Sequence, residues 1–540
     1  MKKLFTVLTA LVLLCACLPL SVSAETSGTY GKLTYEIELG KVIITDCDEN
    51  ATGKIEVPAE IDGYPVTSIY IGAFQDCKYL SDVVLPDSIV SIGMSAFADC
   101  DNLSSVVIPE GVTSIDMWAF RSCEKLTSVS LPDSVNYIGD SAFYYCTSLR
   151  NIHFPNKPLR ICSDVLSGTP YYQDSSNWDN GVLYLGPHLL DAKTYLSDTY
   201  IVKTGTLSIA SEAFADCSRL VEVAIPDGPT SLMYATFTKC TSLTKVVLPD
   251  SITFFGRQIF KGCTSLASIQ LPKNLCEMQD NVFLDTALYN NESNWQDGVL
   301  YVGNYLIEAK NEITGDYTVA EGTTVIAESA FQGCEFLTAV TIPESVATIG
   351  SSAFNDCTAL ADITIPDCAV DIGSYAFYDT AYYGDDSHWV DDVFYVGNHL
   401  VEGEVGGTYT VREGTVTIAP YAFISKYIDS RGLLENVTIP ASVIYIGESA
   451  FYGHNNLTDV YYDGTREQWE QICILEDNRP LEKADIHFAD DDSDSNKEDR
   501  QNRDEYEKNT DFPWIWVAVG GGVAVIAVLL ILLLKKKKSA

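Results

Sequence analysis

Cysteine is the residue of this chain with the greatest potential for chemistry, and nine cysteines each follow a phenylalanine by three residues. In a secreted protein such cysteines could pair as disulfides. Within each uninterrupted series, however, successive cysteines are separated by the same number of residues, as Cys77 and Cys100 are. Equivalent positions of stacked coils would show this constant separation. Such positions lie about 4.8 Å apart with parallel side chains, whereas a disulfide needs angled Cβ vectors about 3.8 Å apart. We therefore expect buried free thiols that act as small hydrophobic residues. This cysteine column consists of Cys77, Cys100, Cys123, Cys146, Cys217, Cys240, Cys263, Cys334 and Cys357.

The other candidates for chemistry do not form a recognisable site. The six histidines show no metal-binding spacing, and none lies beside a nucleophile motif. His188 and His399 occupy equivalent turns where a third copy has Tyr305, which indicates a tolerant, exposed position. We therefore expect no catalytic residue, no metal and no cofactor, although carboxylates distant in sequence could still meet in space. Spacing predicts no partner for the cysteines outside the column, which are Cys47, Cys162, Cys276, Cys368 and Cys473.

Three aspartates near the C-terminus alternate as in a calcium-binding loop: Asp490, Asp492 and Asp494. Ser495 stands where such a loop needs glycine, and Gln501 stands where it needs the closing glutamate. We interpret these aspartates as the solvated charge of a linker.

The constant step extends beyond the cysteines. The phenylalanines and the prolines keep it too, as in Pro86, Pro109 and Pro132. A fixed period of about 20 to 29 residues is typical of a stacked solenoid. Such a chain presents a long surface and usually performs no chemistry.

One unit, at 126–146, shows what each coil contains. Apolar and serine residues alternate over 126–131, which predicts a short half-buried strand. The proline that follows ends this strand, because it has no N–H for the ladder. A second extended stretch returns to the core at 135–138, Gly139 permits a bend, and 142–143 suit one helical or 3-10 turn. A single unit cannot bury its apolar residues alone, so it must stack on its neighbours.

The recurring pattern L-x-x-V-x-[LI]-P-x-x-[VI]-x-x-I-G-x-x-A-F-x-x-C runs from about Pro58 to His454. It resembles the BspA-like leucine-rich repeats of bacterial surface proteins. The resemblance implies a leucine-rich-repeat solenoid, a β-rich right-handed superhelix with a parallel sheet and short helical or 3-10 turns. The period alone would also allow another β-solenoid.

Three units are much longer than the others and carry threonine in place of the cysteine: Thr169, Thr286 and Thr380. Each long unit continues through tyrosines to a tryptophan and then to two apolar runs that flank a short turn, as in GVLYLGPHLL. This pattern predicts a hairpin. The aromatic residues could bind a ligand, but we favour packing, because a protruding hairpin needs large apolar contacts.

Sequence composition predicts the following order of segments: a signal peptide at 1–24, an N-terminal cap at 25–57, the solenoid at 58–460, a C-terminal cap at 461–488, an acidic disordered linker at 489–512, a transmembrane helix at 513–534 and a basic cytoplasmic tail at 535–540. In the C-terminal cap, we expect Trp469 and Ile472 to cover the last coil. Cys17 keeps open the alternative of a lipoprotein site. Lysines after the apolar segment predict that the C-terminus stays in the cytoplasm and that the repeats face outward from the cell membrane.

The net charge of −40 argues against nucleic acid as a partner and against docking on anionic lipid. We therefore expect a single-pass bacterial surface protein whose repeats bind an unknown extracellular protein or glycan, a role in adhesion or interaction that the family resemblance also implies. The alternatives are a structural spacer or envelope protein without a ligand and, less favoured, a glycan-active enzyme.

The best candidate surface is the outward face of the first strand of each unit, at the two alternating residues before the proline. Most of these residues are small and uncharged, so a partner could approach the sheet closely; small residues would equally suit a crowded side of the coil. The candidates are Asp82, Ser105, Ser128, Ser130, Asn151, His153, Glu222, Lys245, Gln270, Thr341, Asp362 and Thr364. The hairpins add Tyr184, Tyr301 and Tyr395.

Overall fold

The computed structural model of this protein describes residues 26–38, 40–367, 371–423, 433–475 and 477–489. The predicted signal peptide with Cys17, the transmembrane helix, the cytoplasmic tail, the calcium-like aspartates and Cys368 all lie outside these residues. No helix in the described part of the chain is long and apolar enough to cross a membrane.

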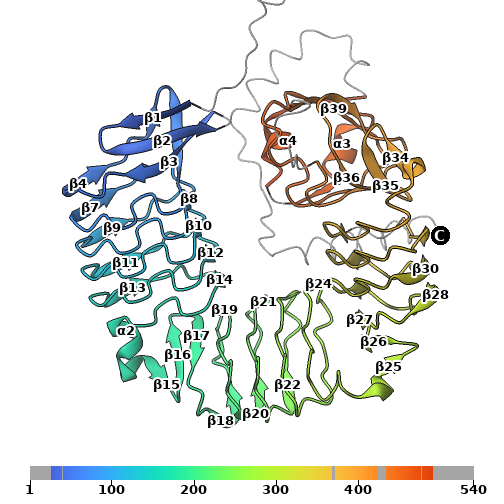
Figure 1. Ribbon diagram of the computed structural model, residues 1–540, viewed down its shortest axis with the longest axis horizontal. Helices are drawn as coiled ribbons and strands as arrows, with labels where there is room; N and C mark the ends of the chain where they lie inside the picture. The colour runs from blue at the N-terminus through green and yellow to red at the C-terminus, as the bar shows by residue number, and fades with distance from the viewer. Residues whose placement is uncertain (1–25, 39, 368–370, 424–432, 476, 490–540) are drawn as a thin grey trace, which may run out of the picture. The chain divides into compact units, whose positions relative to one another are not determined.

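The chain divides into two compact units, each of which is a stack of coils. Unit 1 comprises Met1–Pro155 and Leu166–Gln173, and unit 2 comprises Asn156–Val165 and Asp174–Ala540. Most coils contribute a first strand before the proline and a shorter second strand after it, and the two kinds of strand lie on opposite sides of the stack (Figure 1).

In unit 1, first strands pair in parallel with first strands of neighbouring coils, and second strands pair with second strands. The paired residues are equivalent positions of successive repeats, as Asp82 and Ser105 are. The first strands are β4 (Gly53–Glu56), β7 (Leu80–Val84), β9 (Ser105–Val107), β11 (Ser128–Ser130) and β13 (Asn151–His153). The second strands are β6 (Tyr64–Ile69), β8 (Ser91–Ile92), β10 (Ser114–Ile115) and β12 (Tyr137–Ile138), and the short β5 (Glu60–Ile61) pairs with β6.

Unit 2 repeats this pattern in several sheets. Its first strands are β18 (Ser197–Ile201), β20 (Arg219–Ala224), β22 (Lys245–Val247), β28 (Thr314–Thr318), β30 (Phe336–Thr341), β32 (Asp362–Thr364), β37 (Gly407–Thr410), β39 (Leu434–Ile439), β41 (Asp459–Tyr462) and β43 (Asp485–Phe488). Its second strands are β14 (Arg160–Ile161), β19 (Ser208–Ile209), β21 (Ser231–Leu232), β23 (Phe254–Phe255), β24 (Glu277–Met278), β29 (Val325–Ile326), β31 (Thr348–Ile349), β33 (Asp371–Ile372), β38 (Thr417–Ile418), β40 (Tyr445–Ile446) and β42 (Cys473–Ile474).

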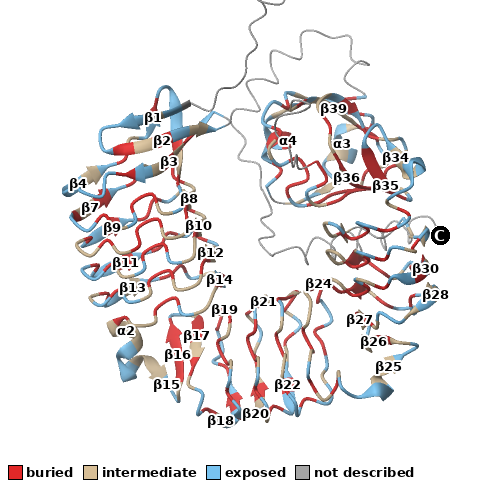
Figure 2. Ribbon diagram, viewed as in Figure 1, coloured by how far each residue is buried: buried red, intermediate tan, exposed pale blue. Residues whose placement is uncertain are grey.

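The repeated phenylalanines form the centre of each stack. Phe74, Phe97 and Phe120 are fully buried, and their rings stack with centroids 4.8 and 5.2 Å apart. The same stacking recurs in unit 2, for example between Phe331 and Phe354 at 4.9 Å. Figure 2 shows the buried residues recurring from coil to coil in both units. The predicted solenoid, with one coil for each repeat of the sequence pattern, is therefore confirmed.

The corner around each phenylalanine differs from the predicted helical or 3-10 turn. Residues 140–145 form successive turns, because Ser141 and Tyr145 have φ values of 54° and 58°, and left-handed residues interrupt a helix. Gly139 also has another role than the predicted bend. A Cβ atom there would lie 2.4 Å from the Met117 backbone nitrogen, so glycine is needed because two coils approach closely.

The predicted hairpins are present, but they are built into the stack and do not protrude from it. In the second long unit, a 3-10 helix at Glu292–Asn294 leads to β25 (Trp295–Gln296), β26 (Val299–Val302) and β27 (Tyr305–Ala309). β27 pairs antiparallel with β26 and parallel with β29, so it takes the position of a second strand. The other two long units contain β15 (Trp178–Asp179), β16 (Val182–Leu185) and β17 (His188–Ala192), and β34 (Trp389–Val390), β35 (Val393–Val396) and β36 (His399–Gly403).

The threonines that replace the cysteine start each insert. The Thr286 hydroxyl donates to the Phe283 carbonyl at 2.7 Å and accepts from the Tyr289 N–H at 3.0 Å. Thr380 makes the same pair of contacts with Phe377 and Tyr383. The hydroxyl therefore caps the turn at which the chain leaves the regular coil; in the first long unit, the helix α2 (Pro170–Gln173) follows.

Both ends of the repeat region are covered. The antiparallel strands β1 (Thr26–Tyr30), β2 (Leu33–Glu38) and β3 (Lys41–Cys47) join the first coil of unit 1 through β3 and β6. At the other end are the helices α3 (Arg466–Trp469) and α4 (Arg479–Lys483). Trp469 and Ile472 pack against the last apolar cluster of unit 2, as predicted.

Candidate interaction surface

The first-strand face consists of the outward side chains of the first strands. In β9, Ser105 and Val107 are exposed on either side of the buried Val106, and β11 repeats this alternation. Ten of the twelve predicted residues on this face are exposed, and Asp82 and Glu222 are half-buried. The alternation arises because successive side chains of a strand point to opposite faces.

The structure brings the predicted residues together in three groups. In unit 1, Asp82 lies opposite Ser105, Ser128 opposite Asn151, and Ser130 opposite His153. In unit 2, Glu222 pairs with Lys245 in one sheet, and Thr341 and Thr364 pair in another together with Asp362. The coil at 266–270 contains no strand, so Gln270 is exposed but does not lie on the strand that the sequence predicted.

In unit 1, a hydrogen bond between neighbouring strands joins Asp82 and Ser105. The Asp82 carboxylate accepts from the Ser81 hydroxyl at 2.7 Å and from the Ser105 hydroxyl at 2.8 Å. These bonds, the one from Ser81 first, lower the pKa of Asp82 because they stabilise its charged form. This part of the face therefore presents an ordered carboxylate among small hydroxyl groups.

Sequence reasoning missed the C-terminal end of the first-strand face. The ring of Tyr461 is exposed and stacks on His487 with centroids 4.8 Å apart. His487 Nε2 also lies 2.8 Å from Asp459 Oδ1. The segments DVYY and DIHF at 459–462 and 485–488 continue the strand alternation, and that alternation was the signal that could have revealed this group.

The hairpin tyrosines, the alternative candidates for a ligand, are largely covered by the rest of the stack. Tyr184 and Tyr395 are buried and Tyr301 is half-buried. Their hydroxyls pair with those of other tyrosines: Tyr184 with Tyr200 at 3.0 Å, Tyr301 with Tyr317 at 3.0 Å, and Tyr395 with Tyr409 at 3.1 Å. The favoured interpretation, in which the insert aromatics pack onto the solenoid, agrees with this burial.

His188 and His399 are fully buried, so the prediction of an exposed position is wrong. His399 Nε2 lies 3.1 Å from the Pro366 carbonyl, and its Nδ1 lies 2.8 Å from the Thr417 hydroxyl. Tyr305 replaces histidine in the second long unit, and its hydroxyl donates to the Pro272 carbonyl at 2.7 Å. The side chain at this position therefore satisfies the carbonyl of one of the repeated prolines, which sequence spacing could not show.

The cysteine column is entirely buried, as predicted, and its thiols have structural partners. Six of them donate to the carbonyl of the phenylalanine in the preceding coil at 3.0 to 3.1 Å, for example Cys100 to Phe74. The described cysteines are all free thiols. Burial raises the pKa of Cys217 to about 12, which makes such a thiol a poor nucleophile.

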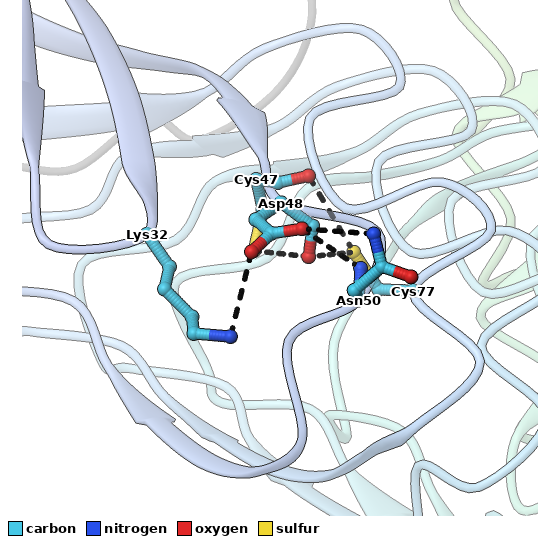
Figure 3. Close-up of polar contacts among 5 residues, drawn as sticks. All are labelled: Lys32, Cys47, Asp48, Asn50 and Cys77. Atoms are coloured by element: carbon cyan, nitrogen blue, oxygen red, sulfur yellow. Dashed lines mark hydrogen bonds and ion pairs between the residues drawn. The ribbon is translucent and has the colours of Figure 1, made fainter.

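Cys47 extends the cysteine column to the N-terminal cap. The sequence did not reveal this, because Cys47 is further from Cys77 than the constant separation within the column. The Cys77 thiol lies 3.9 Å from the Cys47 carbonyl oxygen and 3.9 Å from that of Asp48 (Figure 3). Asp48 accepts from the Asn50 N–H at 3.0 Å and from the Lys32 amine at 3.4 Å. These contacts fix the turn that joins the cap to the first coil.

No group of three or more histidine, cysteine or acidic side chains in the described segments is arranged to hold a metal ion.

The solenoid and its periodic core define a leucine-rich-repeat protein. The model of the BspA type leucine rich repeat region matches residues 64–178, 192–314, 314–385 and 409–487 in six copies. The chain belongs to this family.

Several solved structures are similar to this chain, and no curated protein matches it. A leucine-rich repeat protein of T. pallidum is 25% identical over 45% of this chain and 91% of that chain, with a TM-score of 0.25. A leucine-rich cell surface protein from Faecalibacterium prausnitzii A2-165 is 23% identical over 83% of this chain and 97% of that chain, with a TM-score of 0.22. A leucine-rich repeat protein from Bacteroides capillosus ATCC 29799 is 34% identical over 24% of this chain and 100% of that chain, with a TM-score of 0.23.

Proposed function

We propose that this protein binds an extracellular protein or glycan through its first-strand face. The observation that carries the proposal is the exposed, in-register array of small polar side chains, such as Ser105, Ser128 and Ser130, over a fully buried core. Membership of the BspA-type family, whose members are generally binding or structural proteins, supports a role without catalysis. A continuous array of exposed strands can contribute the roughly 800 Å² per partner of a standard interface.

The proposal includes export and anchoring of the chain at a bacterial surface. The apolar segments at 4–20 and 513–534 support it, together with the lysines at 535–538. Protease treatment of intact cells tests this arrangement. Loss of the repeat region with retention of a small C-terminal fragment is the expected result, whereas full protection of the repeats would contradict it.

Screening the purified chain on glycan and matrix-protein arrays tests binding itself. We expect saturable binding to at least one component. If repeated screens show no binding, the alternative of a structural spacer is favoured. Turnover of an arrayed glycan would instead favour an enzyme.

A triple variant locates the contact. S105E/S128E/S130E should keep the fold, because these side chains point to solvent, and should weaken binding by inserting charge and bulk. The matched control is V129E: Val129 is 4% exposed, so a buried unpaired carboxylate there should destroy folding. Unchanged binding by the folded triple variant would exclude this stretch of the face.

A further inference from the structure

Three coils that are far apart in sequence meet on the second-strand side of unit 2. Cys276, Ala347 and Tyr445 form one buried apolar cluster, against which Ile444 and Cys473 also pack. These residues belong to or adjoin β24, β31, β40 and β42. The stack is therefore curved tightly enough for its late coils to touch its middle coils.

Two carboxyl groups border this cluster. Glu277 follows Cys276 directly, and Asp371 begins β33 in the coil after Ala347. Asp371 Oδ1 and the Tyr445 hydroxyl oxygen are shielded from solvent, and the hydroxyl faces the carboxyl. The Tyr445 hydroxyl offsets part of the cost of ionising Asp371, but the cost of burying the charge outweighs it.

The charged groups facing these carboxyls are mainly acidic. Glu277 faces Asp371, Glu328 and Glu448, and its one cationic neighbour in the described chain is Arg160. Asp371 faces Tyr445 and Glu448. The remaining titratable neighbours are the cysteines of the cluster: Cys276, which faces both carboxyls, and Cys473, which faces Asp371.

Arg160, the cation that faces Glu277, and Arg257, which pairs with the neighbouring Glu328, both have other partners. The Arg160 guanidinium lies over the Phe254 ring at 5.6 Å, and Arg257 binds Asp280 at 3.0 Å and Glu328. Ionisation of both Glu277 and Asp371 therefore places two negative charges at a shielded contact with little compensation.

Burial is the main cause that raises the pKa of Glu277 to about 7 and that of Asp371 to about 6. Both values exceed those of the exposed groups, so the contact binds protons more tightly than the separated coils do. Its stability is complete in acid and is lost as the pH rises from about 4 to about 7.

We propose that the contact between the middle coils and β40 is a proton-operated closure: it is closed when Glu277 and Asp371 carry protons and opens when both are ionised. Opening exposes Tyr445 and Ile444 and relaxes the curvature of the coils between β24 and β40.

Hydrogen exchange of the full chain tests this closure at about pH 5 and pH 8, after correction for intrinsic rates. The protection factors of peptides that cover 444–447 and 473–475 should be at least about tenfold lower at pH 8 than at pH 5. A tenfold change corresponds to a pKa difference of about one unit between the closed and the open contact. The variant E277Q/D371N cannot ionise at these positions, so it should stay protected at both pH values.

The matched control is D362N, because Asp362 lies in the same coil as Asp371 but is exposed on β32; it should behave as the unmodified chain. Should the double variant fail to fold, E277Q alone should retain more protection at pH 8 than the unmodified chain. Equal protection of the unmodified chain at both pH values would overturn the proposal. So would opening of the folded amide variants to the same extent as the unmodified chain.

Discussion

His454 Nε2 lies 2.6 Å from the Phe423 carbonyl oxygen, and this contact replaces the one that a cysteine thiol makes in six other coils. His454 follows Phe451 by three residues, so it occupies the position of the cysteine column. Its Nδ1 also accepts from the Leu434 N–H at 3.0 Å. The fold therefore requires at this position a buried donor to the preceding coil, and two different residue types provide one.

Substitutions of His454 should separate the contribution of side-chain size to stability from the contribution of hydrogen bonding. H454A leaves the Phe423 carbonyl and the Leu434 N–H unpaired, which should cost about 1–3 kcal/mol for each buried group. H454C restores the donor to Phe423, so it should destabilise less than H454A does. Thermal unfolding of both variants measures the difference, and equal melting temperatures would contradict the assigned role.

The buried histidines should make the protein less stable in acid. Burial lowers the pKa of both His399 and His454, and protonation of His454 would also break the hydrogen bond that its Nδ1 accepts from the Leu434 N–H. Their contribution is complete above the unfolded value of 6.5 and is lost as the pH falls through the lower folded value.

The variant H399Y introduces the residue that the second long unit has at the same position. It should keep the bond to the Pro366 carbonyl and reduce the loss of stability between about pH 6.5 and pH 5. Melting temperatures of the variant and the unmodified chain across this range give the comparison. Parallel curves would show that His399 does not carry the acid sensitivity.

The column thiols should react only after unfolding. We expect Cys77, Cys100 and the seven equivalent cysteines to resist alkylation in the native chain, because they are fully buried. Denaturation without reductant should then make all of them reactive. Mass spectra that show these cysteines mainly in disulfides would refute the free-thiol interpretation.

Because two coils approach closely at Gly139, replacing this glycine should lower the stability of the fold. G139A places a methyl group against the Met117 backbone, and such overpacking typically costs about 1–3 kcal/mol. The control is G384A, because the nearest atom to a Cβ at Gly384 is 3.7 Å away. A lower melting temperature for G139A alone is expected, and equal values for the two variants would contradict the packing argument.

Periodicity predicted the core well, because a stack of equal coils must place the same side chain at the same depth in every repeat. The buried phenylalanines, the column thiols and the alternation of β9 and β11 all follow from it. The burial of His188 and His399 did not follow, because it depends on contacts between coils; His399, for example, contacts the Pro366 carbonyl of another coil. The contact of Tyr445 with Cys276 depends on the curvature of unit 2, which no local pattern encodes. Ten of the twelve candidates on the first-strand face are exposed, whereas the hairpin tyrosines are buried or half-buried, and exposure does not identify a ligand.

The end of the solenoid has a consequence for how such chains change in length. The Asn478 side chain is fully buried and accepts from the Phe451 N–H at 3.1 Å, whereas in the interior the Phe331 N–H binds the Ala353 carbonyl of the next coil. The Asn478 side-chain nitrogen also donates to the Gly447 carbonyl at 2.7 Å. One amide thus imitates the backbone of a missing coil, so this capping contact recognises only the last coil. The capping contact would survive the gain or loss of whole upstream repeats, whereas the packing of Cys473 against the Cys276 cluster would have to be built anew.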